Sequence, residues 1–196
     1  MKIAILGGAF DPPHLGHYEL AKEVLKAELA DQIWYMPAGY HVYDKKMAPT
    51  LDRLYMCWLN RALDQRNVEV SPYEMAQRLD GATWSLMNAL MVDPYFRHHE
   101  FSYIIGLDNA NTIVQWVNYQ MLLDKVPFIV VPRQGEEINS GVDWYRKGHH
   151  RFLDVKVPSI SSTEIRWGIK KQESEWKSLV HPAVYHYITE HKLYQV

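Results

Sequence analysis

Two histidines near the start of the chain lie in a segment whose composition suits the binding of phosphate groups. The segment is GGAFDPPHLGH, residues 7–17, and it lies between a short apolar run and a stretch with helical spacing of apolar residues. Glycine lets a backbone approach a ligand where a Cβ would collide, and the Asp-Pro-Pro step stiffens the turn. A helix that begins near Pro13 would place His14 and His17 on adjacent turns at its positive end. The segment therefore predicts a site for phosphate oxygens.

A second pattern of this kind, VPSISSTEIRWGI at residues 157–169, lies near the other end of the chain. The S-x-x-E spacing predicts that Ser161 caps a helix, with Ser162 and Thr163 offering free backbone N–H groups in its first turn. Arg166 would lie near the positive end of that helix, where its charge is unfavourable unless an anion is bound. The pattern thus predicts a second phosphate site.

The apolar pattern predicts which elements position these two segments. Short runs rich in β-branched and aromatic residues alternate with segments of helical spacing, which is typical of a parallel sheet with helices on both faces. The predicted strands are residues 2–6, 32–36, 68–70, 101–106 and 126–131. The predicted helices lie near residues 15–29, 51–64, 83–92 and 109–124, with a last one in 181–194 that has proline in its first turn. We expect an α/β fold with a Rossmann-like parallel sheet, formed by residues 1–196 as one domain with a C-terminal helical end.

Composition narrows the classes of protein. A chain of 196 residues with 47% hydrophobic content suits a single well-packed domain. A formal net charge of −2, with no run of lysine or arginine longer than a doublet, disfavours nucleic acid as a partner. No apolar run reaches the ~18 residues needed to span a bilayer, and no signal region is apparent. The single cysteine, Cys57, cannot form an internal disulfide. We therefore expect a cytoplasmic protein that binds neither nucleic acid nor a membrane.

Taken together, the two phosphate patterns resemble the nucleotidyltransferase superfamily, whose signatures are an (H/T)-x-G-H loop and an I-S-S-T-x-x-R helix. Within it, the chain resembles the nicotinate/nicotinamide mononucleotide adenylyltransferase family over nearly its whole length. The further segments that carry this resemblance are IIGLDNANTIVQW at 104–116, FIVVPRQG at 128–135 and the closing LVHPAVYHYITEHKLY. The resemblance implies an enzyme of NAD biosynthesis that joins ATP to a pyridine mononucleotide and releases pyrophosphate. No covalent protein intermediate is implied, so the protein would act by positioning and charge stabilisation.

The resemblance also implies roles on the ATP side. His17 would contact the reacting α-phosphate, His14 a neighbouring phosphate, and Arg166 the outer phosphates. Gly106 and Asp108 would meet the ribose and adenine. The residues implied to bind ATP are Gly8, Ala9, Phe10, Gly106, Asp108, Arg133, Ser161, Ser162 and Thr163. Mg²⁺ is implied on the phosphates, held through water and substrate oxygens, because the sequence has no dedicated carboxylate cluster as a protein metal site.

On the mononucleotide side, the resemblance implies an aromatic plate and a phosphate clamp. Trp116 would stack on the pyridine ring, and the backbone around Thr83 and Trp84 would meet its carboxylate or carboxamide. Lys45 or Lys46 would hold the phosphate, although the P-P-H-(K/R) tetrad of the nicotinate-preferring bacterial pattern is absent here.

Two positions bear on how closely the chain follows the family. Ala9 stands where many relatives have threonine, which removes one hydroxyl beside the mononucleotide phosphate. Tyr73 stands where some relatives have a second ring-stacking aromatic residue.

Other functions stay open at this point. An adenylyl- or cytidylyltransferase that acts on another phosphate acceptor would share both phosphate patterns. A non-catalytic regulatory module could bind NAD or ATP with the same fold. His14, His17 and Arg166 count against the regulatory module, because sensing alone does not need residues directed at the transferring phosphate. The sequence leaves open the preference between nicotinate and nicotinamide, and also whether the chain forms a homo-oligomer.

Overall fold

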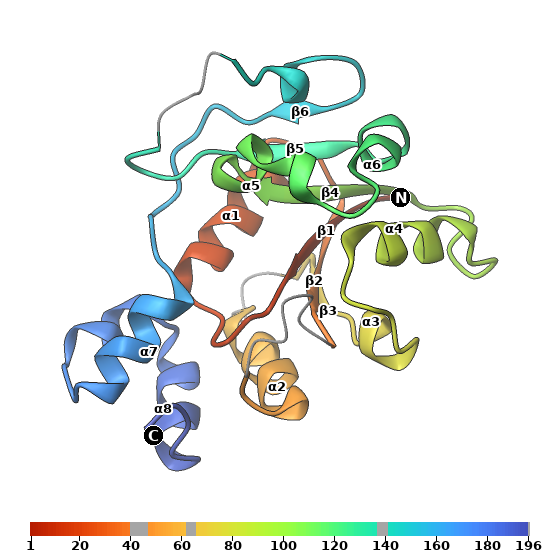
Figure 1. Cartoon of the computed structure of the whole chain (residues 1–196). Coiled ribbons are helices and arrows are strands. Elements are labelled where there is room, and N and C mark those ends of the chain that lie inside the picture. Colours follow the sequence, from red (N-terminus) through yellow and green to blue (C-terminus); the bar gives the residue numbers. More distant parts are fainter. Residues whose placement is uncertain (40–46, 62–65, 137–140, 196) are drawn as a thin grey trace.

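The computed structural model describes residues 1–39, 47–61, 66–136 and 141–195. Within these residues the strands form one parallel sheet with the order β3-β2-β1-β4-β5-β6 (Figure 1). The strands are β1 (Lys2–Gly8), β2 (Gln32–Pro37), β3 (Val68–Val70), β4 (Glu100–Gly106), β5 (Phe128–Val131) and β6 (Arg151–Phe152). The α-helices are α1 (Leu15–Lys26), α2 (Thr50–Asn60), α3 (Tyr73–Ala76), α4 (Thr83–Val92), α5 (Leu107–Asn111), α6 (Tyr119–Lys125), α7 (Ser162–Lys170) and α8 (Pro182–Glu190). Short 3₁₀ helices are η1 (Ile113–Gln115), η2 (Trp144–Arg146) and η3 (Glu175–Leu179).

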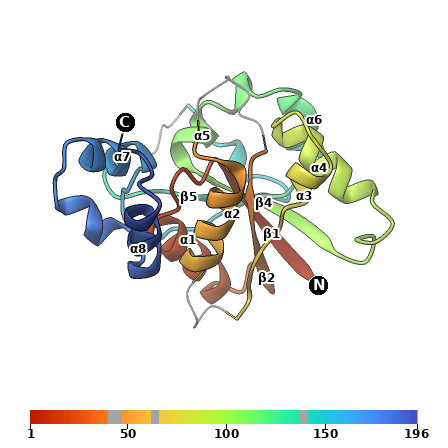
Figure 2. The same ribbon diagram turned by 90° about the horizontal axis from the view of Figure 1, so that it is seen from below.

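Apolar side chains bury both faces of the sheet, which confirms the predicted α/β fold. Alternate residues of β1 point to opposite sides, so that Ile3 and Ile5 pack with α4 and α6, while Ala4 and Leu6 pack with α1. Figure 2 shows α1 and α2 on one side of the sheet and α4 and α6 on the other. Among the helices of the described ranges, none combines the length and apolar character that crossing a bilayer requires.

The C-terminal helices form a third apolar cluster with α2. Met56 of α2 is fully buried there against side chains of α7 and α8. The hydroxyl of Tyr187 in α8 donates to Asp52 of α2 at 2.7 Å. Helix α8 has Pro182 in its first turn, as the sequence predicts, so this helix is confirmed. The cluster holds α7 at a defined place relative to the sheet.

Several predicted boundaries were wrong. A single helix over 109–124 is contradicted, because Trp116 is extended and Asn118 has φ of 55°, which separates η1 from α6. The helix predicted near 15–29 ends at Lys26, and the one predicted over 51–64 ends at Asn60. Strand β6 was not predicted, because two residues are too few to show a period.

The order of the strands determines where a ligand can bind. Strand β1 pairs with β2 on one side and with β4 on the other. The sheet therefore grows in one direction from β1 to β3 and in the opposite direction from β4 to β6. In open α/β sheets, ligands bind beyond the carboxyl ends of the strands at such a point. The segment after β1 and the segment after β4 therefore face the expected site.

Gly7 provides a test of the packing at the end of β1. A Cβ on this residue would overlap the hydroxyl of Tyr103 from β4, whereas a Cβ on Gly8 would meet only Phe10 Cε2, at 3.8 Å. Gly7→Ala should therefore lower the free energy of unfolding by about 1–3 kcal/mol, measured by urea denaturation. Gly8→Ala is the matched control and should cost less. Equal losses for the two variants would contradict the assigned overlap.

Candidate active site

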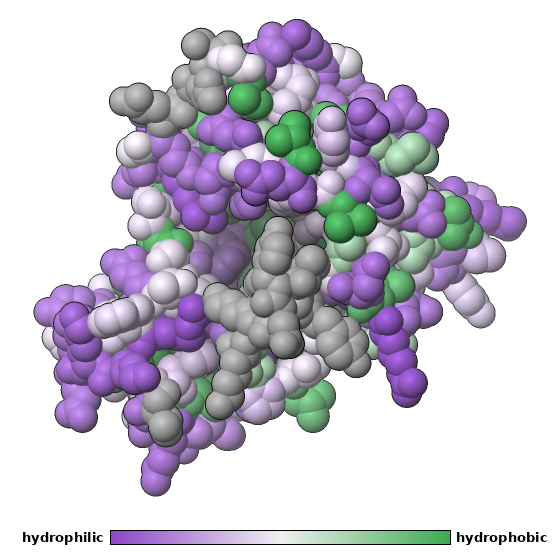
Figure 3. Space-filling model, in the orientation of Figure 1, coloured by the Kyte–Doolittle hydropathy of each residue, from purple (hydrophilic) through white to green (hydrophobic). Residues whose placement is uncertain are grey.

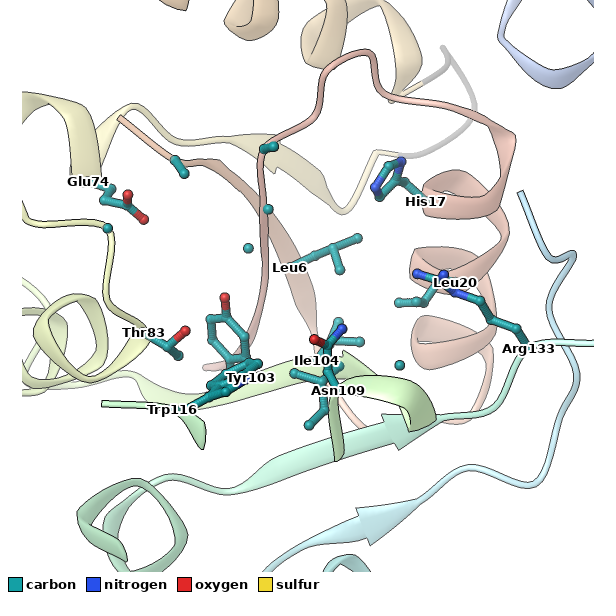
Figure 4. Close-up of a pocket in the computed structure, with 17 residues that line it drawn as sticks. Leu6, His17, Leu20, Glu74, Thr83, Tyr103, Ile104, Asn109, Trp116 and Arg133 are labelled. Atoms are coloured by element: carbon teal, nitrogen blue, oxygen red, sulfur yellow. The ribbon is translucent and has the colours of Figure 1, made fainter. Parts of the chain in front are cut away.

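A cavity of about 270 Å³ lies at the carboxyl ends of β1 and β4 (Figure 4). The face shown in Figure 3 is mostly hydrophilic and is hollowed near its centre. Residues from several parts of the chain line this cavity. His17 and Arg133 lie at one end of it, and Glu74, Thr83 and Trp116 lie at the other. The sequence-predicted residues that line it are Gly8, Ala9, His17, Thr83, Gly106, Trp116 and Arg133.

The rings of the two histidines lie against each other at the start of α1, tilted by 33°. His14 caps the helix, and its backbone N–H donates to Nδ1 of His17 at 3.2 Å. The ring centroids are 3.8 Å apart, and Phe10 packs on His17 at 4.7 Å. A Cβ on Gly16 would lie 3.0 Å from Nδ1 of His14, so glycine at this position leaves room for the ring. This packing gives a physical reason for the H-x-G-H spacing.

Both histidine rings are neutral near pH 7. Burial, followed by the positive charge of Arg133, lowers the pKa of His17 to about 3. The pKa of His14 is also well below its ordinary value, because of burial and the proximity of His17. Since Nδ1 of His17 accepts the backbone N–H, the proton of the neutral ring lies on Nε2. His17 can therefore donate a hydrogen bond to a ligand without carrying a charge.

Side chains of helix α7 form hydrogen bonds with the backbone of the segment after β1. The side chain of Ser161 accepts from the backbone N–H of Glu164 at 3.1 Å, which confirms the predicted cap. Ser162 Oγ donates to the carbonyl of Pro12 at 2.8 Å, and Arg166 Nη1 donates to the carbonyl of Asp11 at 2.6 Å. The two segments predicted to bind phosphate are thus in contact, although they are about 150 positions apart.

Arg166 and Thr163 do not line the cavity that contains His17. Arg166 Nη2 donates to Thr163 Oγ1 at 3.1 Å, and both residues line a second cavity of about 500 Å³ beside Asp11. Of the residues predicted to bind phosphate, His17 therefore lines the first cavity, and Thr163 and Arg166 line the second. The lining of these two cavities does not include His14, Ser161 or Ser162. The segment after β1 contributes to both, through Ala9 and Asp11.

The remaining residues predicted on the ATP side lie around this end of the sheet. Gly106 ends β4, and a Cβ there would be 2.5 Å from Oδ1 of the exposed Asp108. The Arg133 side chain lines the cavity near Gly106. Phe10 is buried in the core and contacts His17 rather than the cavity space.

Trp116 and Thr83 mark the mononucleotide end. Trp116 meets Tyr103 edge to face at 6.4 Å, and both rings line the cavity beside Thr83 (Figure 4). Tyr73 does not line it, because its hydroxyl donates to Asp93 at 2.9 Å and its ring packs on Phe96. Trp84 is half-buried against the core. Lys45 and Lys46 lie outside the described residues.

Two residues that the sequence did not predict are Glu74, which lines the first cavity, and Arg53, which holds the backbone beside it. Glu74 lines the cavity and accepts from the N–H of Gly39 at 3.1 Å, and burial raises its pKa to about 7. Arg53 is 1% exposed and donates to the carbonyl of Ala9 at 2.8 Å and of Ala48 at 3.1 Å. An arginine on an amphipathic helix is usually on the surface, so no signal in the sequence distinguishes this one.

The sequence predicts Mg²⁺ on the substrate phosphates and no metal site made by the protein alone. In the described part of the chain, no group of three or more histidine, cysteine, aspartate or glutamate side chains could hold a metal ion. Mg²⁺ commonly keeps several waters and is bound through substrate phosphates. Binding of Mg²⁺ together with a nucleotide stays a prediction.

Comparison with known proteins gives consistent matches. The cytidylyltransferase-like family matches residues 5–168. A probable nicotinate-nucleotide adenylyltransferase of Oceanobacillus iheyensis is 31% identical, covering 98% of this chain and 96% of its own, and one of Anaeromyxobacter sp. strain K is 33% identical, covering 99% and 97%. The nicotinic acid mononucleotide adenylyltransferase of Plasmodium falciparum complexed with NaAD has the same fold, with a TM-score of 0.82, 20% identity, and coverage of 98% and 97%.

The buried neutral state of His17 predicts a pH dependence of stability. In the unfolded chain a histidine binds a proton as the pH falls through about 6.5, whereas folded His17 stays neutral down to about 3. The unfolded state therefore binds more protons in this window, and the free energy of unfolding falls as the pH falls. His17→Asn should reduce that slope by up to about 1.4 kcal/mol per pH unit, measured by urea unfolding between about pH 5.5 and 4. The same change at the exposed His186 is the control, and an unchanged slope for His17→Asn would contradict the neutral state.

Proposed function

The chain belongs to the cytidylyltransferase-like family and, within it, to the nicotinate-nucleotide adenylyltransferases, and on this basis we propose how its cavities carry out the reaction. The enzyme is a nucleotidyltransferase of NAD biosynthesis. It joins ATP to nicotinate or nicotinamide mononucleotide and releases pyrophosphate. A phosphate oxygen of the mononucleotide attacks the α-phosphorus of ATP, and the bond from that phosphorus to the β-phosphate oxygen breaks.

We assign the transferring phosphate to His17. Its neutral ring can donate from Nε2 to an oxygen of the α-phosphate, where charge accumulates as pyrophosphate leaves. Arg133 lies close enough to the two histidines to lower their pKa values, so its positive charge acts at the same place. His14 would support the neighbouring phosphate and hold the His17 ring through its backbone N–H.

The outer phosphates of ATP would lie at the N-terminus of α7. Ser162 and Thr163 present their backbone N–H groups there, and Arg166 adds a guanidinium one turn further along. The contact between α7 and the segment after β1 is the observation that carries the proposal, because it joins both phosphate-binding segments. Mg²⁺ bound to the phosphates would neutralise charge that develops on the leaving group.

The pyridine mononucleotide would occupy the other end of the first cavity. Trp116 offers a ring face for stacking, and the N-terminus of α4 at Thr83 offers backbone N–H groups to a carboxylate or carboxamide. Gly106 and Asp108 would contact the ribose and adenine of ATP at the end of β4.

A direct assay tests this activity against the two alternatives. Purified protein mixed with ATP and Mg²⁺ should release pyrophosphate and form a dinucleotide only when nicotinate or nicotinamide mononucleotide is added. Release with a different phosphate acceptor alone would identify another transferase. Nucleotide binding without pyrophosphate release from any acceptor would identify a regulatory module.

Two substitutions should separate the roles of His17 and Trp116. His17→Ala removes a contact that strengthens in the transition state, so kcat should fall by about two to four orders of magnitude. Trp116→Ala removes stacking on a ring that does not react, so it should chiefly raise KM for the mononucleotide, by about one to two orders of magnitude. Steady-state kinetics on variants shown to be folded by circular dichroism measure both effects. Survival of kcat in His17→Ala together with its loss in Trp116→Ala would reverse the assignment.

A further inference from the structure

Near its C-terminal end, the chain returns to the segment after β1. We propose that Tyr194 is a positioning residue that controls the guanidinium of Arg166 through the carboxylate of Asp11. The inference rests on the proposed role of Arg166 at the outer phosphates of ATP. Tyr194 and Asp11 are 183 positions apart, and Tyr194 lies just beyond α8.

The carboxylate of Asp11 links three parts of the molecule. Its Oδ1 accepts from the hydroxyl of Tyr194 at 2.9 Å and from the backbone N–H of Ala48 at 2.9 Å. Its backbone carbonyl accepts from Arg166 Nη1 at 2.6 Å, and Oδ2 lies 3.7 Å from the same nitrogen. Asp11 is 1% exposed and the Arg166 side chain 21%, so water screens this pair much less than a pair at the surface. The orientation of the carboxylate therefore affects where the guanidinium lies.

The two donors on Oδ1 hold the carboxylate in an orientation in which it does not form a bidentate pair with Arg166. Across the described residues, Oδ2 of Asp11 has no hydrogen-bond partner, and at 3.7 Å it attracts Arg166 without a hydrogen bond. Carboxylates and guanidinium groups favour a bidentate pair when both are free to turn. If the Tyr194 hydroxyl is lost, Asp11 can turn towards Arg166 and draw the guanidinium away from a bound phosphate.

The conformation of the chain end supports a defined role for Tyr194. Its backbone φ is 66° and that of Lys192 is 50°, in the left-handed region that non-glycine residues adopt uncommonly. Surrounding contacts must hold such a conformation, and Leu193 and Tyr194 both pack against the cluster formed by α2, α7 and α8. Burial and the neighbouring Asp11 raise the pKa of Tyr194, so its hydroxyl remains a donor.

Tyr194 also shares a cavity with the phosphate-binding residues. The second cavity, of about 500 Å³, is lined by Asp11, Thr163, Arg166 and Tyr194, together with Lys170 and Lys192. Figures 1 and 2 place the C-terminal end beside α7 and α8. A change at Tyr194 therefore acts on the ATP side of the site, and not at Trp116.

Two tyrosine variants test the proposal. Tyr194→Phe removes only the hydroxyl, and KM for ATP should rise about three- to tenfold, the scale of one ordinary hydrogen bond, with KM for the mononucleotide unchanged. Tyr187→Phe is the matched control, because that hydroxyl also donates from the C-terminal region to a carboxylate, Asp52, which lies outside both cavities. It should leave KM for ATP unchanged even where it lowers Tm. Equal rises in both KM values, or equal effects of the two variants, would indicate a structural role only and overturn the proposal.

A double-mutant cycle with Arg166→Ala shows whether the effect passes through Arg166. In that background Tyr194→Phe should change KM for ATP less than about twofold. A full effect there would overturn the proposal. If Arg166→Ala raises KM for ATP but Tyr194→Phe does not, the proposal fails and the proposed function stands. If Arg166→Ala itself leaves ATP handling unchanged, the phosphate role of Arg166 and the proposal both fail.

A second variant keeps the test decisive if Tyr194→Phe does not fold. Asp11→Asn retains an oxygen for the Tyr194 hydroxyl but removes the charge that attracts Arg166. It should also change KM for ATP, and this change should disappear in the Arg166→Ala background. An unchanged KM for ATP in Asp11→Asn would overturn the proposal.

Discussion

The site depends on two hydrogen bonds that side chains of α7 donate to the backbone of the segment after β1. Ser162 and Arg166 reach the carbonyls of Pro12 and Asp11. Buried carbonyls need partners, and a segment with two successive prolines has few N–H groups of its own to form a regular turn. The packing of α8 against α2, and of both against α7, holds the donors in place. The helical end of the chain therefore helps to form the proposed phosphate site and does not only cover the sheet.

The first cavity has few charged side chains, and the positive and the acidic ones lie at opposite ends. Arg133 supplies a permanent positive charge at the His17 end, and Glu74 is the acidic side chain at the Trp116 end among the described lining residues. The two histidines add donors without adding charge, because burial keeps them neutral. This distribution of charge supports the proposed placement of the phosphates at the His17 end and of the pyridine ring at the Trp116 end.

Much of this arrangement could be predicted because the sequence carries local signals for it. The apolar runs predict the central strands, and the S-x-x-E spacing predicts the cap at Ser161, which the structure confirms. Other features depend on distant contacts that leave no local pattern. Arg53 is buried because the carbonyls of Ala9 and Ala48 lie beside it, and Tyr73 faces Asp93 because of how α3 packs. The break at Asn118 is a single left-handed residue inside a segment of helical composition.

The distance along the chain between the two halves of the proposed phosphate site has a consequence for protein synthesis. The histidine segment is made first, and its partners on α7 follow about 150 residues later. At about 5–20 residues per second, roughly 10–30 seconds separate the two during translation. Until then Asp11 and Pro12 lack the side chains that hold them, so a nascent or prematurely terminated chain has no complete phosphate site. A truncated product would therefore lack the α7 contacts that the proposed ATP site requires.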